Sequence, residues 1–335
     1  MVRSPPPHLA PLVPVLDRLP GSRVVVVGDY VADEYVYGET ERISREAPVL
    51  IVRYERSELV PGGAGNAAQN LAALGVEVRA VGLAGDDALG TRLLAALRDG
   101  GVDVRGIQRI RGRATESKTR ILAGGRSTRR QQMLRVDRTP EPVPAAVERR
   151  LVAALRRAAR GATAVLASDY GSGVLSPRVI EALRALRREG VPVCVDSRYN
   201  LAAFTGLTML KPNEPELEAA TGIRAKTPAE LARAARALQR RLGCEMLLVT
   251  RGRHGMSLFR RGEPPLHVAA HGDKEAVDVT GAGDTVAATW TAVIASGADA
   301  AAASRIANVA AALVVQKAGT ATVSREELRG ELLGT

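Results

Sequence analysis

Residues 278–285 read Asp-Val-Thr-Gly-Ala-Gly-Asp-Thr and stand directly before an alanine-rich segment, Val286–Ser296, that predicts a helix. Gly281 and Gly283 allow the backbone to approach a phosphate closely, because neither residue carries a Cβ atom. The start of the helix adds unpaired N–H groups and the positive end of the helix dipole. This stretch, with Ala282 between the glycines, therefore predicts an anion-binding site.

Asp284 lies in the first turn of the predicted helix, next to the anion-binding site. From there its carboxylate could take a proton from a hydroxyl group while the hydroxyl oxygen attacks a γ-phosphate. Aspartate is also common at helix starts as a cap. The motif by itself leaves both interpretations open.

A second glycine-rich stretch, residues 61–71, reads Pro-Gly-Gly-Ala-Gly-Asn-Ala-Ala-Gln-Asn-Leu and opens another predicted helix. Gly62 and Gly63 again leave room for a ligand beside the backbone. Asn66 can both donate to and accept from sugar hydroxyls. The alternative is a tight loop that leads into an amphipathic helix.

Around these motifs, short apolar runs alternate with segments of helical periodicity. Residues 23–28 (Arg-Val-Val-Val-Val-Gly) are typical of a fully buried parallel strand. The alternation predicts an α/β fold with a mainly parallel sheet covered on both faces. Residues 34–55 and 117–137 instead alternate polar and apolar side chains, which predicts a small β-strand lid. We expect a proline-rich arm over residues 1–22 and one main domain over residues 23–330.

The composition is basic: 335 residues include 47 Lys and Arg against 36 Asp and Glu, a formal net charge of +11. Such a charge suits nucleic acid, an anionic membrane or a phosphorylated small molecule. Because no DNA- or RNA-binding motif accompanies the dispersed arginines, we expect solvated helix faces and no nucleic-acid partner. Prolines interrupt the amino terminus, and no segment approaches the roughly 20 apolar residues of a membrane span. We therefore expect a cytoplasmic protein without a membrane partner.

The two glycine-rich motifs together resemble the paired signature of the ribokinase-like, or PfkB, carbohydrate kinases, GGxGNxAxxLxxLG followed by DxTGAGD. The resemblance extends from about Arg23 to Glu327. It implies a ribokinase-like three-layer α/β/α fold with a small β lid, and an ATP-dependent kinase acting on a sugar hydroxyl. It favours Asp284 as the catalytic base over a helix cap.

The resemblance also implies a nucleotide site. Asn213 and Glu216 match the NxxE motif that arranges Mg²⁺ and water around the nucleotide phosphates, and Mg²⁺ prefers oxygen ligands and keeps several waters. The alternative for this pair is an acidic helix start. The residues expected to bind ATP are Asn213, Glu216, Thr250, Gly252, Gly255 and Asn308, although Asn308 could equally serve helix packing. A monovalent-cation requirement stays open.

Asp29 and Asp33 follow the first predicted strand, at the edge where open α/β sheets bind ligands. In the family this loop holds sugar hydroxyls, whereas two carboxylates could also bind a metal or cap a turn. The residues expected to bind the sugar are Asp29, Asp33, Gly62, Gly63, Asn66, Lys118, Arg120 and Asp169.

Within the family, the sequence is most similar to heptose 7-phosphate kinases. The similar stretches are Gly28-Asp29, Tyr37-Gly38, Arg42-Ile43-Ser44, Glu46-Ala47-Pro48, Lys118-Thr119-Arg120, residues 131–137 (Gln-Gln-Met-Leu-Arg-Val-Asp) and Ser168-Asp169-Tyr170-Gly171. Lys118, Arg120 and Arg135 could receive the substrate phosphate, or they could be ordinary exposed strand charges. We expect D-glycero-D-manno-heptose 7-phosphate as the acceptor. The alternatives are another sugar or nucleoside, or a non-catalytic sugar or nucleotide sensor.

Two departures from those kinases leave the acceptor open. Ser172 stands where they usually carry lysine, and Asp196-Ser197-Arg198-Tyr199 stands where they carry Asp-Pro-Lys-Gly. Because lid strands often pair between subunits in this family, we expect a homodimer. The sequence stops at Thr335, so we expect no fused nucleotidyltransferase domain behind the kinase.

Overall fold

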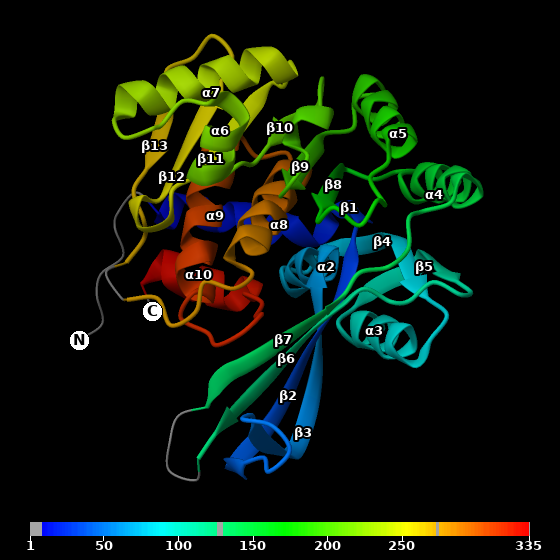
Figure 1. Ribbon diagram of the computed structural model, residues 1–335. Coiled ribbons are helices and arrows are strands. Elements are labelled where there is room, and N and C mark those ends of the chain that lie inside the picture. Colours follow the sequence, from blue (N-terminus) through cyan, green and yellow to red (C-terminus); the bar gives the residue numbers. More distant parts are fainter. Residues whose placement is uncertain (1–8, 126–129, 273–274, 335) are drawn as a thin grey trace.

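A mainly parallel sheet forms the centre of the molecule (Figure 1). The computed structural model describes residues 9–125, 130–272 and 275–334, and within them nine strands follow the order β13-β12-β11-β10-β9-β8-β1-β4-β5. The pairs β11–β12 and β12–β13 are antiparallel. The strands are β1 (Arg23–Gly28), β4 (Glu77–Gly85), β5 (Val102–Ile110), β8 (Ala164–Asp169), β9 (Val193–Ser197), β10 (Met209–Leu210), β11 (Met246–Thr250), β12 (Met256–Arg260) and β13 (Leu266–Val268).

Helices cover both faces of this sheet and give the molecule three layers (Figure 1). The α-helices are α1 (Val13–Arg18), α2 (Ala64–Ala73), α3 (Ala88–Asp99), α4 (Ala145–Ala158), α5 (Pro177–Arg188), α6 (Glu214–Thr221), α7 (Pro228–Leu242), α8 (Ala282–Ala295), α9 (Ala300–Val314) and α10 (Arg325–Leu333). Short 3₁₀ helices span Ala10–Leu12, Leu19–Gly21, Leu201–Ala203 and Gly252–His254.

The valines of β1 explain why this strand lies at the centre. Val24 and Val26 belong to the core cluster that includes α2, α8 and α9, whereas Val25 and Val27 belong to the cluster that includes α4, α5 and α7. Since alternate side chains of a strand point to opposite faces, a run of valines is needed where both faces are buried. The predicted three-layer α/β/α arrangement is confirmed.

The chain changes direction across the sheet at β1. It first adds β4 and β5 on one side of β1 and later adds β8, β9, β10 and β11 on the other. In open α/β sheets, ligands bind at the carboxyl ends of the strands at such a switch point. Gly28 at the end of β1 lies beside Ser168 of β8. Asp29 and Asp169 therefore lie next to one another at this edge.

A second sheet of four strands, in the order β3-β2-β6-β7, projects from the main body (Figure 1). Its strands are β2 (Tyr30–Ile43), β3 (Leu50–Gly63), β6 (Ser117–Gly124) and β7 (Gln131–Arg138). The segments in which we predicted lid strands, 34–55 and 117–137, contribute strands to this sheet, and residues 126–129 of the second segment lie outside the described residues. Every residue of the edge strand β7 is exposed. Its role as a lid stays a prediction.

The segment before β1 is helical where the structure describes it. Within the predicted arm, residues 1–8 lie outside the described residues, whereas Leu16 and Leu19 are fully buried in the core. Asp17 of α1 forms an ion pair with Arg329 of α10, which joins the two ends of the chain. Over residues 9–125, 130–272 and 275–334, no helix has the length and apolar character needed to cross a membrane.

Candidate active site

Asp284 is buried at the start of α8, with 5% of its surface exposed. Its Oδ2 accepts a hydrogen bond from Asn66 Nδ2 at 2.8 Å, and its Oδ1 accepts one from Tyr170 Oη at 2.7 Å. The helix cap is Gly281, which makes no side-chain cap bond. The two glycine-rich motifs therefore meet in space, and the carboxylate is bound by two side chains from other segments.

The surroundings of Asp284 act on its pKa in opposite directions. Burial raises the pKa of Asp284 to about 6, and the neighbouring carboxylate of Asp196 adds to this effect. Hydrogen bonds from Asn66 and Tyr170 and the positive charge of Lys211 oppose it. A carboxyl group with a pKa near neutral is suited to act as a general base at physiological pH.

Asn66 is itself held by a chain of hydrogen bonds. Its Oδ1 accepts from Asn70 Nδ2 at 3.0 Å, and Asn70 Oδ1 accepts from Thr285 Oγ1 at 3.1 Å. Because Oδ1 of Asn66 is occupied in this way, its Nδ2 is directed toward Asp284. Asn70 was not predicted to belong to the site. Its position four residues after Asn66 on α2 is the signal that could have indicated the contact.

Gly281 closes the turn in front of α8 with a positive φ of 77°, and a Cβ atom there would lie 2.6 Å from Asn66 Nδ2. Gly281→Ala should therefore displace the Asn66 amide and lower phosphoryl transfer by about 10²-fold, because small misplacements are costly in catalysis. Gly297→Ala is the matched control, because Gly297 has a φ of 79° and open space around it.

Both substitutions place alanine in a left-handed conformation and should each lower the free energy of unfolding by about 1–2 kcal/mol. Urea denaturation and initial-rate assays of the two variants separate these effects. Equal activities in the two variants would contradict the role of Gly281 in holding Asn66.

Lys211 and Asp196 form a buried ion pair beside Asp284, and neither residue was predicted to act in the site. Lys211 is 4% exposed, and its Nζ lies 2.9 Å from Asp196 Oδ1. A Cβ atom on Gly283 would lie 3.5 Å from the same Nζ, so the ammonium group borders the predicted anion-binding turn. Burial lowers the pKa of Lys211, but the carboxylates of Asp196, Glu216 and Asp284 together outweigh burial and keep that pKa above its ordinary value.

Asp29 is bound by the loop that follows β8. Its carboxylate accepts from the backbone N–H groups of Tyr170 at 2.7 Å, Ser172 at 3.2 Å and Val174 at 3.3 Å. Burial raises the pKa of Asp29 to about 6 despite these bonds. With 1% of its surface exposed, Asp29 organises this loop, and its contact with a sugar stays a prediction.

Asp169 and Asp33 also have partners within the protein. Asp169 accepts from Ser197 Oγ at 2.7 Å, and Asp33 pairs with Arg120 at 2.6 Å. The predicted glycines lie against this group: a Cβ on Gly62 would meet Asp33 Oδ2 at 2.1 Å, and one on Gly63 would meet the backbone oxygen of Asp29 at 2.6 Å. Their lack of side chains thus lets β3 end close to the predicted sugar site.

The three lid cations differ in position. Lys118 lies 3.7 Å from Glu116 and 5.9 Å from the centre of the Tyr170 ring, close to the Asp284 network. Arg120 is bound to Asp33. Arg135 pairs with Asp137 at 2.8 Å on the exposed strand β7. A substrate phosphate would therefore compete with a carboxylate at each of these cations.

The predicted Mg²⁺ residues begin α6. Asn213 Oδ1 accepts from the backbone of Glu216 at 2.8 Å, and Glu216 Oε2 accepts from the backbone of Asn213 at 2.9 Å. This reciprocal cap corresponds to the alternative interpretation of an acidic helix start. The negative charge of Glu216 also contributes to the raised pKa of Lys211. Within the described residues, no group of three metal-ligating side chains forms a complete site. The carboxylate oxygens of Glu216 are of the type that Mg²⁺ prefers, and a Mg²⁺ site held through water stays a prediction.

The remaining predicted ATP residues gather at the neighbouring turn. Thr250 ends β11 and bridges to Asn213. Gly252 and Gly255 have positive φ angles, and a Cβ on Gly255 would lie 2.6 Å from the Ala269 carbonyl carbon. The side-chain amide of Asn308 donates to the Ala269 carbonyl at 2.7 Å. The residues predicted from three separate segments therefore line one region of the molecule.

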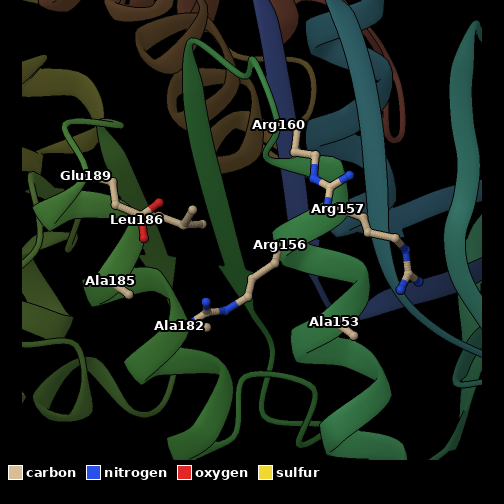
Figure 2. A pocket seen from close by; sticks show the side chains of 8 residues that line it. All are labelled: Ala153, Arg156, Arg157, Arg160, Ala182, Ala185, Leu186 and Glu189. Atoms are coloured by element: carbon tan, nitrogen blue, oxygen red, sulfur yellow. The ribbon is translucent and has the colours of Figure 1, made fainter.

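A cavity of about 500 Å³ lies elsewhere, between α4 and α5 (Figure 2). Arg156, Arg157 and Arg160 line it from α4 and the residues after it, and Glu189 lines it from the end of α5. These residues precede β8 and β9, so the cavity lies at the opposite edge of the sheet from Asp284. None of the predicted site residues lines this cavity.

A parallel α/β sheet and a buried carboxylate behind a glycine turn are the features expected of an enzyme that handles phosphate groups. The family model of pfkB family carbohydrate kinases matches residues 22–327. The chain therefore belongs to the pfkB family of carbohydrate kinases, and the predicted family and enzyme class are confirmed.

Curated relatives include the bifunctional protein HldE of Pelobacter propionicus, 42% identical over 317 residues, and that of Bradyrhizobium diazoefficiens, 43% identical over 329 residues. These matches cover 94% and 96% of this chain but 64% and 66% of the relatives. The chain therefore spans slightly less than two thirds of their length.

Solved structures with the same fold include Arabidopsis thaliana ribokinase complexed with ribose and ATP, with a TM-score of 0.73 and 25% identity over 93% of this chain and 98% of that one. Escherichia coli phosphofructokinase-2 in complex with potassium has a TM-score of 0.76 and 20% identity, with the same coverage of both chains. The ribokinase-like fold is thereby confirmed.

Proposed function

We propose that this protein is an ATP-dependent kinase that phosphorylates a hydroxyl group of a sugar phosphate, with D-glycero-D-manno-heptose 7-phosphate as the acceptor and the 1,7-bisphosphate as the product. The observation that carries the proposal is Asp284, buried behind the Gly281 turn and held by Asn66 and Tyr170. The similarity to HldE proteins supports the heptose phosphate. The ribokinase solved with ribose and ATP supports ATP as the donor.

In the proposed reaction, Asp284 accepts the proton of the acceptor hydroxyl while the hydroxyl oxygen attacks the γ-phosphorus in line with the leaving oxygen. The backbone N–H groups of the turn at Gly281 and Gly283 and the ammonium of Lys211 face the charge that develops on the phosphoryl oxygens. Asn213 and Glu216 would hold Mg²⁺ through water, and the ion would neutralise phosphate charge when bound.

The second sheet supports two further parts of the proposal. As a lid, it would exclude water and so keep ATP hydrolysis low until the sugar is bound. Its outer edge β7 exposes Met133, Leu134 and Val136 at 41%, 55% and 51% of their surfaces. An exposed apolar edge strand suits pairing with a second copy, so we propose a homodimer. We further propose a cytoplasmic enzyme without nucleic-acid or membrane partners.

The acceptor is the part of the proposal that needs the most direct test. Ser172 and Arg198 are the residues at which this chain departs from the heptose kinases. The Ser172 hydroxyl contacts Glu116, and Arg198 is exposed near the ring of Tyr199. Both residues border the loop that carries Tyr170.

A coupled ADP-release assay with Mg-ATP should be run over free and phosphorylated sugars of five to seven carbons. We expect turnover with heptose 7-phosphate to exceed turnover with the free heptose. Activity on a free sugar, with none on any phosphorylated one, would contradict the proposed acceptor. Failure of every sugar, with nucleotide binding retained, would favour the sensor instead.

A further inference from the structure

Tyr170 is the second donor to the candidate base, and the proposed reaction gives it no role. Its hydroxyl donates to Asp284 Oδ1 at 2.7 Å. Burial raises the pKa of Tyr170 well above its ordinary value, and the negative charge of Asp284 adds to this effect. The hydroxyl therefore stays protonated across the physiological range and acts as a permanent donor.

The backbone around Tyr170 is fixed by contacts that do not involve Asp284. The Asp29 carboxylate binds the N–H groups of Tyr170, Ser172 and Val174. The guanidinium of Arg113 donates to the Ser172 carbonyl at 3.3 Å. The backbone that carries Tyr170 is therefore held in place independently of Asp284.

We propose, on the basis of the proposed function, that Tyr170 is a positioning residue for the base: its hydroxyl orients the Asp284 carboxylate and stabilises its ionised form. The effect resembles that of other donors to carboxylates, since a hydrogen bond to the charged form favours that form. Without the hydroxyl, Oδ1 of Asp284 would lose its donor inside the protein, which is costly for a buried anion.

The other groups that face Asp284 do not replace this donor. Asp196, on β9, carries a negative charge that disfavours the ionisation of Asp284. Lys211, which follows β10, carries a positive charge, but it is already paired with Asp196. From α2, Asn66 is neutral and serves the other oxygen, Oδ2. Removal of the Tyr170 hydroxyl should therefore favour the protonated form of Asp284.

The first test is the pH dependence of Tyr170→Phe. The acid limb of kcat/KM should move upward by about half to one pH unit, the size expected for one lost donor. Activity should then fall several-fold more at pH 6 than at pH 8. Tyr30→Phe is the matched control, because Tyr30 is buried and its hydroxyl donates to the Val26 carbonyl at 3.0 Å. Tyr30→Phe should leave the acid limb of kcat/KM at the pH of the wild type.

A second measurement does not depend on activity. With ¹³C-labelled aspartate, the carboxyl resonance of Asp284, assigned by its absence in Asp284→Asn, should titrate at higher pH in Tyr170→Phe. Incorporation of 3-fluorotyrosine at position 170 should move the titration in the opposite direction, because fluorine makes the phenol a stronger donor. This variant also serves if the phenylalanine variant fails to fold.

The outcomes separate the two proposals. An unchanged Asp284 titration in the folded Tyr170 variants, or an equal loss of activity at every pH, would overturn the positioning role while leaving the kinase proposal intact. The expected shifts in a protein that phosphorylates no sugar would support the positioning role and contradict the proposed function.

Discussion

Asp284→Asn should lose about 10²–10⁴-fold in phosphoryl transfer, the range attributed to a general base, while ATP binding persists. The variant should fold, because an amide fits the same space: its oxygen can accept from Asn66 Nδ2 and its nitrogen can donate to Tyr170 Oη. Initial rates with the sugar identified in the screen, and ATP binding by calorimetry, measure the two effects. Wild-type turnover in this variant would contradict the proposed mechanism.

The stability of Asp284→Asn gives an independent check. The pKa of Asp284 is raised from 3.8 to about 6 in the folded protein by burial, so the ionised carboxylate costs stability. The cost is complete above pH 6 and declines as the pH falls toward 3.8. The variant should therefore be more stable than the wild type at pH 8 and similar to it at pH 4. Asp299→Asn is the matched control.

Asp299 caps α9 by accepting from Ala302 N at 2.7 Å, and asparagine caps helices as well as aspartate. This control should keep both activity and stability. A similar loss of activity in both variants would mean that the assay reports general damage rather than the loss of a base.

Lys211→Met should have the largest effect on stability. Removal of one partner from a buried ion pair leaves the other charge uncompensated and costs about 3–5 kcal/mol. Here Asp196 would remain beside Asp284 without its cation. The cost should shrink at lower pH, because the unpaired Asp196 can then be protonated. Urea denaturation at pH 8 and pH 5 measures this difference.

The double variant Lys211→Met/Asp196→Asn separates stability from catalysis. It should recover much of the stability, because no buried charge is left unpaired, but its transfer rate should stay about 10²–10³-fold low without the ammonium at the Gly283 turn. Lys317→Met is the control, since its pair with Glu327 is partly exposed and such pairs contribute little. Full activity in the double variant would exclude Lys211 from phosphate stabilisation.

Much of the fold could be predicted because its signals are local. The valines of β1 already indicate a strand buried on both faces, and the two glycine motifs already mark the starts of α2 and α8. The family's paired motifs also predicted that the glycine-rich stretch with Asn66 and the one with Asp284 belong to one active site. What these signals have in common is that each depends on residues close together in sequence, or on a resemblance.

The roles of Lys211 and Tyr170 could not be found in that way, although Tyr170 lies in one of the stretches that resemble the heptose kinases. Lys211 follows a strand of two residues, and its role depends on Asp196 from the neighbouring strand and on the turn before α8. Tyr170 acts through a loop whose shape depends on Asp29. For Arg135 the sequence suggested a shared role with Lys118 in binding the substrate phosphate. In the structure Arg135 lies on the exposed strand β7 and pairs with Asp137. Such contacts come from tertiary structure alone.

The distance along the chain between Asn66 and Asp284 has a consequence for biosynthesis. The two residues are 218 positions apart, so a nascent chain exposes its first glycine turn long before its base has been translated. Contacts between such distant segments also form late in folding, because closing a long loop costs entropy. A chain whose synthesis has not yet reached Asp284 therefore has no base for Asn66 to orient.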